Sequence, residues 1–284
     1  MNEIVEKKVL APGTLLFRVS APEIARRAEA GQFVVVRVSE TGERIPLTIA
    51  DFDREQETIT MVFMQAGKTT RMLGALDVGD RILDVVGPLG RPSDVEYCGR
   101  AICVGGGYGV APVFPIARAL KQAANQVIGI IGARTAELII FEKEMASVCD
   151  RLLISTDDGS RGHHGLVTDV LKTILEDGQK TDLVVAIGPA IMMKFVSLMT
   201  KSYGVKTLVS LNALMVDATG MCGVCRVSVG GKTFFSCVDG PEFDGHQVDY
   251  DELIARQSFY LEEERIALER YEEECRGDKR CLGT

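Results

Sequence analysis

Between residues 100 and 212 the chain alternates short apolar runs with segments of helical periodicity, and no other feature restricts its fold as strongly. The apolar runs cover residues 101–107, 127–133, 151–158, 182–188 and 206–212. The helix-period segments between them cover residues 112–124, 137–149, 166–178 and 190–204. Strands that alternate with helices at this spacing form a parallel sheet with helices on both faces. We therefore predict a doubly wound parallel-sheet α/β domain over residues 99–210.

The chain before this region has a different rhythm, with short strand-like runs separated by turn residues. These runs cover residues 14–21, 32–40, 58–66 and 80–88, and glycines stand between them at positions 31, 42, 67, 79 and 87. Short strands at regular spacing are typical of a small antiparallel barrel or sandwich. We predict such a β domain over residues 1–98.

The last third of the chain leaves the alternating pattern. Residues 211–246 contain a cysteine-rich loop, and residues 247–284 form a charged tail. In this tail we predict one helix over residues 249–275, in which the apolar residues Ile254, Leu261 and Leu268 recur every seven positions. Polar residues occupy the companion positions, so we expect this helix to lie on the protein or on a partner rather than in a coiled coil.

Composition restricts the class of protein. A chain of 284 residues is long enough for about two domains. The N-terminus lacks the apolar segment of a secretory signal, and no apolar run is long enough for a membrane span. A net charge of −8 argues against nucleic-acid binding. Of the eight cysteines, three lie within sixteen residues, which favours metal binding in a reducing compartment over disulfides. We expect a cytoplasmic protein.

A glycine-rich loop follows the first strand of the α/β region. It includes Gly106, Gly107, Tyr108, Gly109 and Val110, directly before a helical segment. Bare backbone at such a position lets a diphosphate approach the N–H groups at the helix start. The alternative is a tight turn without a ligand. The loop lacks the Gly-x-Gly-x-x-Gly spacing and lies mid-chain, which indicates a different nicotinamide-nucleotide family.

Two further loops follow apolar strands, at residues 155–165 and 186–194. Both should lie at the carboxyl edge of the sheet, where open α/β folds bind ligands. Gly188 and Pro189 would form a rigid turn beneath a flat ring, and Met192 and Met193 would face a pocket or the core. Ordinary loops with core methionines are the alternative. His163 and His164 have no partner at metal-ligand spacing, and we interpret them as solvated loop residues.

Two segments of the β domain carry phosphate-binding residue types, RIPLT at 44–48 and AGKTTRML at 66–73. An arginine beside a hydroxyl residue suits a phosphate or a ribityl chain, and Gly67, Thr69 and Thr70 offer N–H and O–H donors at the start of a short helix. Polar residues at strand ends without a ligand are the alternative.

The cysteine loop carries the most specific pattern. Cys222 and Cys225 are separated by two residues, Cys237 follows after eleven more, and Asp217 lies five residues before Cys222. The spacing resembles that of plant-type [2Fe–2S] clusters, with Asp217 at the position of the first ligand. A zinc site with one aspartate and three cysteines, and a set of buried cysteines without metal, are the alternatives.

Taken in this order, the β domain, RIPLT, GGGYGVAP, TDDGS, GP-x-x-M and the cysteine loop resemble the electron-transfer subunits of the ferredoxin–NADP reductase superfamily. The members include the iron–sulfur flavoprotein subunit of dihydroorotate dehydrogenase. The chain is more similar to the small subunits of NADH-dependent ferredoxin:NADP oxidoreductase, also called sulfide dehydrogenase. The resemblance covers essentially the whole chain.

The resemblance implies a role for residues in each part of the chain. FAD would be held by Arg44, Pro46, Leu47, Thr48, Phe63, Met64, Gly67, Thr69 and Thr70. The nicotinamide nucleotide would be bound by Gly106, Gly107, Tyr108, Gly109, Val110, Arg134, Asp157, Asp158, Gly188, Pro189 and Met192. The [2Fe–2S] cluster would be held by Asp217, Cys222, Cys225 and Cys237, since the more similar subunits use one aspartate and three cysteines.

Two positions depart from the superfamily pattern. The Arg-x-Tyr-Ser/Thr motif has no tyrosine here, so flavin stacking at that point would be apolar. The cysteine that normally precedes Gly-Pro is Ile187, so a thiol near the nicotinamide is absent.

The resemblance also implies a function. NADH would reduce FAD, and single electrons would pass through the cluster to a larger subunit that carries a second flavin and [4Fe–4S] clusters. This heterodimer would couple NADH, NADPH and, indirectly, ferredoxin by flavin-based electron bifurcation. The alternatives are a dihydroorotate dehydrogenase subunit, a sulfide- or polysulfide-linked oxidoreductase, and a non-catalytic module that senses redox state or nucleotide.

Three details stay open in the sequence. The resemblance favours NAD(H), but Arg134 and Thr135 could meet the 2′-phosphate of NADP(H). Cys275 and Cys281 could lie near a partner. The remaining cysteines, at positions 98, 103 and 149, are expected to be core or surface thiols.

Overall fold

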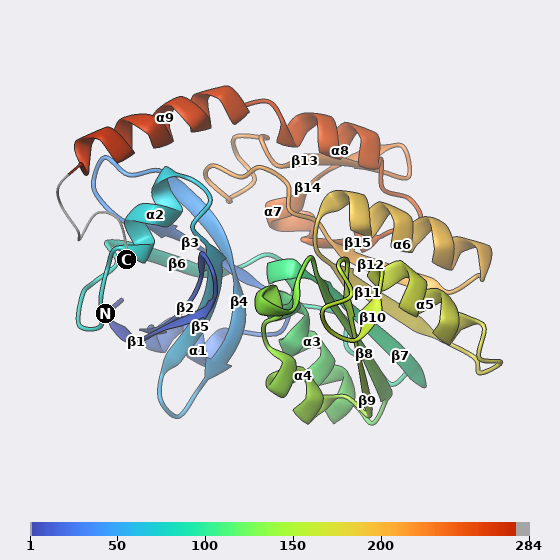
Figure 1. Ribbon diagram of the computed structural model, residues 1–284. Helices are drawn as coiled ribbons and strands as arrows, with labels where there is room; N and C mark the ends of the chain where they lie inside the picture. Colours follow the sequence, from blue (N-terminus) through green and yellow to red (C-terminus); the bar gives the residue numbers. More distant parts are fainter. Residues whose placement is uncertain (1, 277–284) are drawn as a thin grey trace.

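The computed structural model describes residues 2–276, and Cys281 lies outside the described residues. An antiparallel sheet is followed by a mainly parallel sheet with helices on both faces, and two C-terminal helices complete the chain (Figure 1). The predicted fold class is therefore confirmed.

Six strands form the antiparallel sheet, in the spatial order β1-β2-β5-β4-β3-β6. Their bounds are β1 (Ile4–Ala11), β2 (Thr14–Ser20), β3 (Phe33–Arg37), β4 (Arg44–Asp53), β5 (Thr58–Met64) and β6 (Asp84–Leu89). The first half of β4 pairs with β3 and the second half with β5. Residues 2–4 exchange backbone hydrogen bonds with residues 79–82, which connects the two edges of the sheet and closes it into a barrel.

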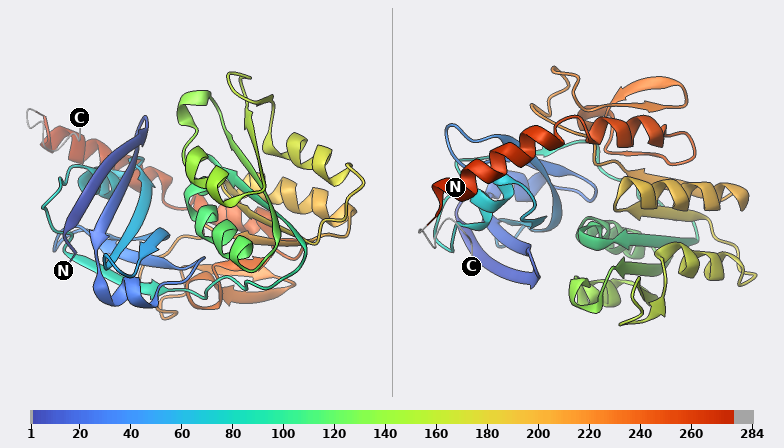
Figure 2. Two further views of the ribbon diagram at one scale, coloured as in Figure 1. Left: turned by 90° about the horizontal axis from the view of Figure 1, so that it is seen from below. Right: turned by 45° about the horizontal axis from the view of Figure 1, so that its top comes forward.

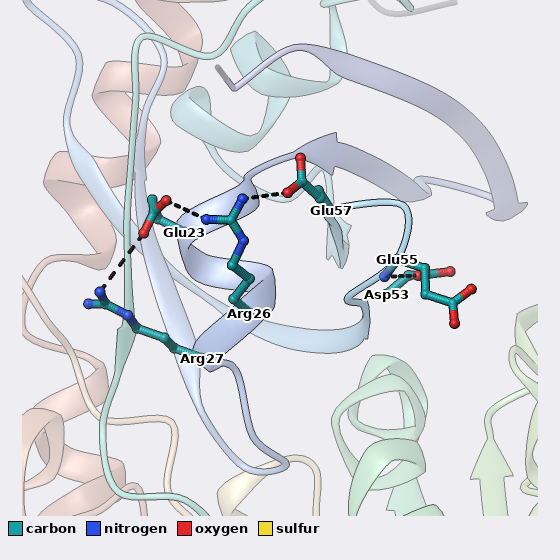
Figure 3. Close-up of polar contacts among 6 residues, drawn as sticks. All are labelled: Glu23, Arg26, Arg27, Asp53, Glu55 and Glu57. Atoms are coloured by element: carbon teal, nitrogen blue, oxygen red, sulfur yellow. Dashed lines mark hydrogen bonds and ion pairs between the residues drawn. The ribbon is translucent and has the colours of Figure 1, made fainter.

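Two short helices accompany the barrel, α1 (Pro22–Arg27) and α2 (Lys68–Gly74). Arg26 of α1 forms ion pairs with Glu23, at 2.8 Å, and with Glu57, at 2.5 Å, beyond the end of β4 (Figure 3). These side chains are solvent-exposed, so the pairs orient α1 but contribute little to stability. The apolar faces of the strands and of α1 fill the barrel core, in which Phe17 and Phe63 meet edge to face.

The second sheet has the strand order β10-β9-β8-β7-β11-β12-β15. Its parallel strands are β7 (Arg100–Gly106), β8 (Gln126–Ala133), β9 (Arg151–Thr156), β10 (His163–His164), β11 (Leu183–Ile187) and β12 (Lys206–Ser210). The helices α3 (Val110–Gln122) and α4 (Glu142–Val148) pack on one face, and α5 (Val167–Leu175) and α6 (Ala190–Ser202) pack on the other (Figure 1). Because β7 and β11 are neighbours, the order of the strands reverses between them.

Three predictions about local elements were wrong. Residues 137–149 do not form one helix, because Phe141 takes a left-handed backbone conformation (φ 56°) and packs its ring on Phe114 before α4 begins. His163 and His164 form the short strand β10 beside β9, although both side chains are exposed. The tail is two helices, α8 (Tyr250–Gln257) and α9 (Leu261–Glu274). The Ser258 hydroxyl bonds to the carbonyls of the preceding turn, which helps end α8.

The segment after β12 packs onto the α/β domain. It contains the hairpin β13 (Arg226–Val229) and β14 (Lys232–Phe235), the short helix α7 (Ser236–Asp239) and the strand β15 (Glu242–Asp244). Strand β15 pairs antiparallel with β12, and Cys225 and Cys237 share a core with α5, α6 and α8. From there α9 runs back across the barrel and lies beside α2 (Figures 1 and 2).

Candidate functional site

Two adjoining cavities lie where the barrel, the α/β domain and the segment after β12 meet. The inner cavity has a volume of about 280 Å³ and the outer cavity about 670 Å³. Both are lined by Pro46, Ala66, Thr70, Ala213 and Met215. Because these residues form walls of both cavities, the two spaces make one extended cleft. Such a cleft between domains is the common position for a cofactor.

The inner cavity brings predicted site residues of both domains together. The barrel contributes Pro46, Leu47, Thr48, Phe63, Met64 and Thr70, and the α/β domain contributes Tyr108, Gly109 and Gly188. Phe63 is only 2% exposed and its ring lies in the barrel core, so little of that ring can contact a ligand. Met64 and the Tyr108 ring are about half exposed at the cavity wall.

The loops after β7 and β11 meet at the point where the strand order reverses, which is the usual ligand position of open α/β sheets. Gly109 lies so close to β11 that a Cβ atom there would be 2.5 Å from the carbonyl oxygen of Ile187. Met192 packs over Gly106 and Gly188, since a Cβ on either glycine would lie within 2.8 Å of its thioether end. Met193 is instead fully buried in the core. The glycines therefore allow both loops to approach one another closely.

Arg134, Asp157 and Asp158 lie further along the same edge and line neither cavity. Backbone N–H groups of Asp157 and Asp158 donate to the carbonyls of Ala133 and Arg134, which joins the loops after β8 and β9. The hydroxyl of Ser160 donates to Asp158 at 2.6 Å, and this bond lowers the pKa of the Asp158 carboxyl. These residues can reach only the part of a dinucleotide that extends beyond the inner cavity.

The outer cavity is lined on the barrel side by Arg44, Gly67, Lys68, Thr69 and Thr70. The donors expected to be free at this loop are engaged within the protein. Thr69 donates to Glu43 at 2.7 Å, the Gly67 N–H donates to Thr70, and the Thr70 hydroxyl donates to the Gly67 carbonyl. Arg44 is exposed and has no ion pair within residues 2–276.

Several residues of the cavity wall were not predicted from the sequence. The inner cavity is also lined by Phe33, Val62, Ala66, Pro112, Ile187, Ser210, Leu211, Asn212, Ala213, Met215 and Pro241. The residues after Ser210 could have been predicted to line the site, because β12 ends at the same carboxyl edge of the sheet as β7 and β11. The segment from Ser210 to Met215 lines the cavity and leads into the cysteine loop.

The four candidate metal ligands lie in two pairs. Oδ1 of Asp217 is 3.1 Å from Sγ of Cys222, and the Sγ atoms of Cys225 and Cys237 are 3.2 Å apart. Asp217 also accepts the backbone N–H of Cys222 at 3.0 Å. The bond from the Cys222 thiol is the main cause that lowers the pKa of Asp217, whereas burial raises the pKa of Cys237.

This pairing bears on the kind of metal centre. Within residues 2–276, no three His, Cys, Asp or Glu side chains are close enough to share one metal ion. A structural zinc site needs four ligands around a single ion. A [2Fe–2S] cluster has two irons, and each iron takes two protein ligands. The two pairs of donors therefore match the two-plus-two ligand arrangement of a [2Fe–2S] cluster.

The conformation of the cysteine loop depends on its own backbone turns and on a hydrogen bond from α8. Ala218, Gly220 and Gly223 have positive φ angles of 57°, 81° and 67°, which turn the backbone around the candidate ligands. From α8, Arg256 donates to the Val224 carbonyl at 2.9 Å. Ser236, next to Cys237, has a buried hydroxyl without a hydrogen-bond partner in the described chain. A sulfur acceptor near this hydroxyl would satisfy it.

Comparisons with known proteins agree with this geometry. The iron–sulfur cluster binding domain of dihydroorotate dehydrogenase B matches residues 212–249, and the oxidoreductase NAD-binding domain matches residues 103–198. The dihydroorotate dehydrogenase B (NAD(+)) electron transfer subunit homolog of Thermotoga maritima is 49% identical over 95% of both chains. The electron transfer subunit of Geobacillus thermodenitrificans is 34% identical over 86% of this chain and 96% of its own. The chain belongs to this family of electron-transfer subunits.

Solved structures of the superfamily extend the comparison. A chain of the NADH-dependent reduced ferredoxin–NADP oxidoreductase, from a study of flavin-based electron bifurcation, is 48% identical with a TM-score of 0.91. The match covers 95% of this chain and 98% of that one. Phthalate dioxygenase reductase, at 19% identity and a TM-score of 0.56, shares the fold.

Family membership confirms several predictions. The chain is an oxidoreductase subunit with an NAD-binding domain and an iron–sulfur domain, and FAD, a [2Fe–2S] cluster and NAD(H) are its cofactors. The roles of individual residues and the domain boundaries stay predictions. Within residues 2–276, every helix is too short or too polar to cross a membrane.

Proposed function

We propose that the chain is the NADH-oxidising electron-transfer subunit of an NADH-dependent reduced ferredoxin:NADP oxidoreductase. One observation carries the proposal: the inner cavity is surrounded by barrel residues, by the loops after β7 and β11, and by the segment that leads into the cysteine loop. A flavin placed there would lie between the nucleotide-binding loops and the candidate cluster ligands.

The proposal assigns residues to three groups. FAD is held by Arg44, Pro46, Leu47, Thr48, Phe63, Met64, Gly67, Thr69 and Thr70, with Phe63 acting through its backbone. The nicotinamide nucleotide is held by Gly106, Gly107, Tyr108, Gly109, Val110, Gly188, Pro189 and Met192, and its far end by Arg134, Asp157 and Asp158. The two iron-ligand pairs are Asp217 with Cys222 and Cys225 with Cys237.

A bound flavin accepts a hydride and releases electrons singly, which joins two-electron and one-electron chemistry. The chain itself contributes position. The close approach of Gly109 to Ile187 fixes the two loops beside the cavity, and positioning is the main requirement of hydride transfer. Met215 lines both cavities, and Asp217 follows two residues later, so the cavity wall leads directly into the cysteine loop.

A larger flavin and [4Fe–4S] subunit is the proposed partner, and the cytoplasm is the proposed location. The 48% identical solved relative supports the ferredoxin-linked assignment. A second candidate is the electron-transfer subunit of dihydroorotate dehydrogenase B, which the match over residues 212–249 supports. The large subunit that co-purifies with the full-length chain separates these two candidates.

Anaerobic titration of the purified, flavin-containing protein tests the proposal. We expect NADH to bleach the flavin absorbance rapidly, and NADPH to do so much more slowly. A protein that binds no flavin, or whose flavin stays oxidised with NADH, contradicts the proposed function. Equal rates with both nucleotides contradict only the preference for NADH.

A further inference from the structure

The C-terminal helix α9 supplies one wall of the outer cavity. The wall residues are Tyr260, directly before the helix, and Glu263, Glu264 and Ala267 within it. Their spacing of three, four and seven residues places all four on one helix face. The barrel residues Arg44 and Lys68 line the same cavity.

Burial in a core does not explain the position of α9. No residue of Leu261–Glu274 belongs to any of the three apolar cores. The helix is attached to the barrel by the ion pair of Glu272 with Arg71 of α2, at 2.6 Å. This face of α9 therefore lies over the outer cavity.

We propose that α9 binds the AMP half of FAD. This inference rests on the proposed function, since it takes the inner cavity as the site of the flavin ring. The outer cavity adjoins the inner one through shared walls, so the remainder of the same cofactor can extend into it. Its volume of about 670 Å³ leaves room for a nucleotide.

The chemistry of the walls fits a nucleoside next to a diphosphate. Neither Glu263 nor Glu264 has a hydrogen bond or ion pair to another side chain among residues 2–276. A carboxylate accepts hydrogen bonds from ribose hydroxyls and from the adenine amino group, but it repels a phosphate. Arg44 and Lys68, which line the same cavity from the barrel, supply the positive charge that phosphates need. Tyr260 offers an aromatic face to the adenine ring.

The proposal predicts how the chain distinguishes FAD from FMN. Both cofactors share the flavin ring, the ribityl chain and one phosphate, but only FAD carries AMP. Interactions with α9 should therefore strengthen FAD binding and leave FMN binding unchanged.

The test uses the full-length chain, freed of flavin and titrated with FAD and with FMN while flavin fluorescence is followed. One variant combines Glu263→Gln and Glu264→Gln, and a second, Ala267→Trp, fills the cavity from the same helix face. Glu273→Gln is the matched control, because this exposed glutamate of α9 lines neither cavity. We expect both test variants to weaken FAD binding about tenfold or more. The glutamine pair loses a charged hydrogen bond, and the tryptophan occupies the space of the ligand.

In the same variants FMN affinity should stay within about twofold of the wild type, and the control should match the wild type for both flavins. FAD affinity that is unchanged in both test variants overturns the inference, as does an equal loss for FAD and FMN. If the wild type binds FAD but too little FMN to measure, loss of FAD binding in the test variants alone supports it. A wild type that binds neither flavin overturns the proposed function itself.

Discussion

Replacing Gly109 with alanine should separate the two loops that face the inner cavity. The backbone conformation of Gly109 (φ −63°, ψ −10°) is open to alanine, so the substitution brings no torsional strain. The added Cβ, however, would lie 2.5 Å from the carbonyl oxygen of Ile187, whereas ordinary contact begins at 3.4 Å. The loop after β7 must therefore move by about 0.9 Å from β11, the difference between these distances.

This movement has to occur between two neighbouring strands, because Ile187 is paired with Gly105 in the sheet. Overpacking of a tight contact costs about 1–3 kcal/mol. We expect Gly109→Ala to lower the free energy of unfolding by about this amount. It should also slow the reduction of the flavin by NADH, since misplacement of the reacting groups by about 1 Å is costly in rate.

Gly106→Ala is the matched comparison. Its Cβ would meet the Sδ atom of Met192 at 2.4 Å, but the far end of a flexible methionine can move aside. We expect a loss of stability below about 1 kcal/mol for this variant. Urea unfolding of both proteins, at equal flavin content, checks the difference. A Gly109→Ala protein as stable as the wild type, or less affected than Gly106→Ala, would mean that the contact between Gly109 and Ile187 is not tight.

Three further predictions follow from the cysteine loop and the junction of the domains. Asp217→Cys should keep a cluster but shift its midpoint potential, because a thiolate is a softer ligand than a carboxylate. An unchanged midpoint potential in a redox titration would mean that Asp217 is not a ligand. Arg256→Ala removes the bond to the Val224 carbonyl and should speed the loss of iron to a chelator; an unchanged rate argues against this support. Burial raises the pKa of Glu242, which bonds to Ser93, so its ionisation destabilises the fold as the pH rises through that raised value. Glu242→Gln should therefore have a higher melting temperature than the wild type at pH 8, and this difference should shrink toward acidic pH. A difference that does not change with pH would mean that the pKa of Glu242 is not raised.

Periodicity was sufficient to predict the α/β domain, because its strands are continuous apolar runs buried on both faces. It failed where tertiary packing overrides local preference. Residues 137–149 have helical periodicity, but the Phe141 ring turns away to pack on Phe114. The tail reads as one helix, and its interruption at Ser258 depends on side-chain bonds that periodicity does not reveal.

The candidate site, too, was predicted from the sequence only where its residues are close together in the chain. Motifs predicted the glycine loops and the ligand spacing, since each depends on residues that are near one another in the chain. The pairing of Asp217 with Cys222 and of Cys225 with Cys237 is visible only in three dimensions. The wall formed by α9 was missed because it is about two hundred residues away from the barrel loop that it faces. Phe63 was assigned to the flavin, although its position on β5 turns the ring into the barrel core.

We infer that two ligand pairs, Asp217 with Cys222 and Cys225 with Cys237, hold a two-iron cluster beside the flavin cavity. An anaerobic EPR spectrum of the dithionite-reduced protein, together with its iron, sulfide and zinc contents, tests this arrangement. We expect about two irons and two sulfides per chain and a signal from one unpaired electron. About one zinc per chain, with neither sulfide nor signal, would rule the arrangement out.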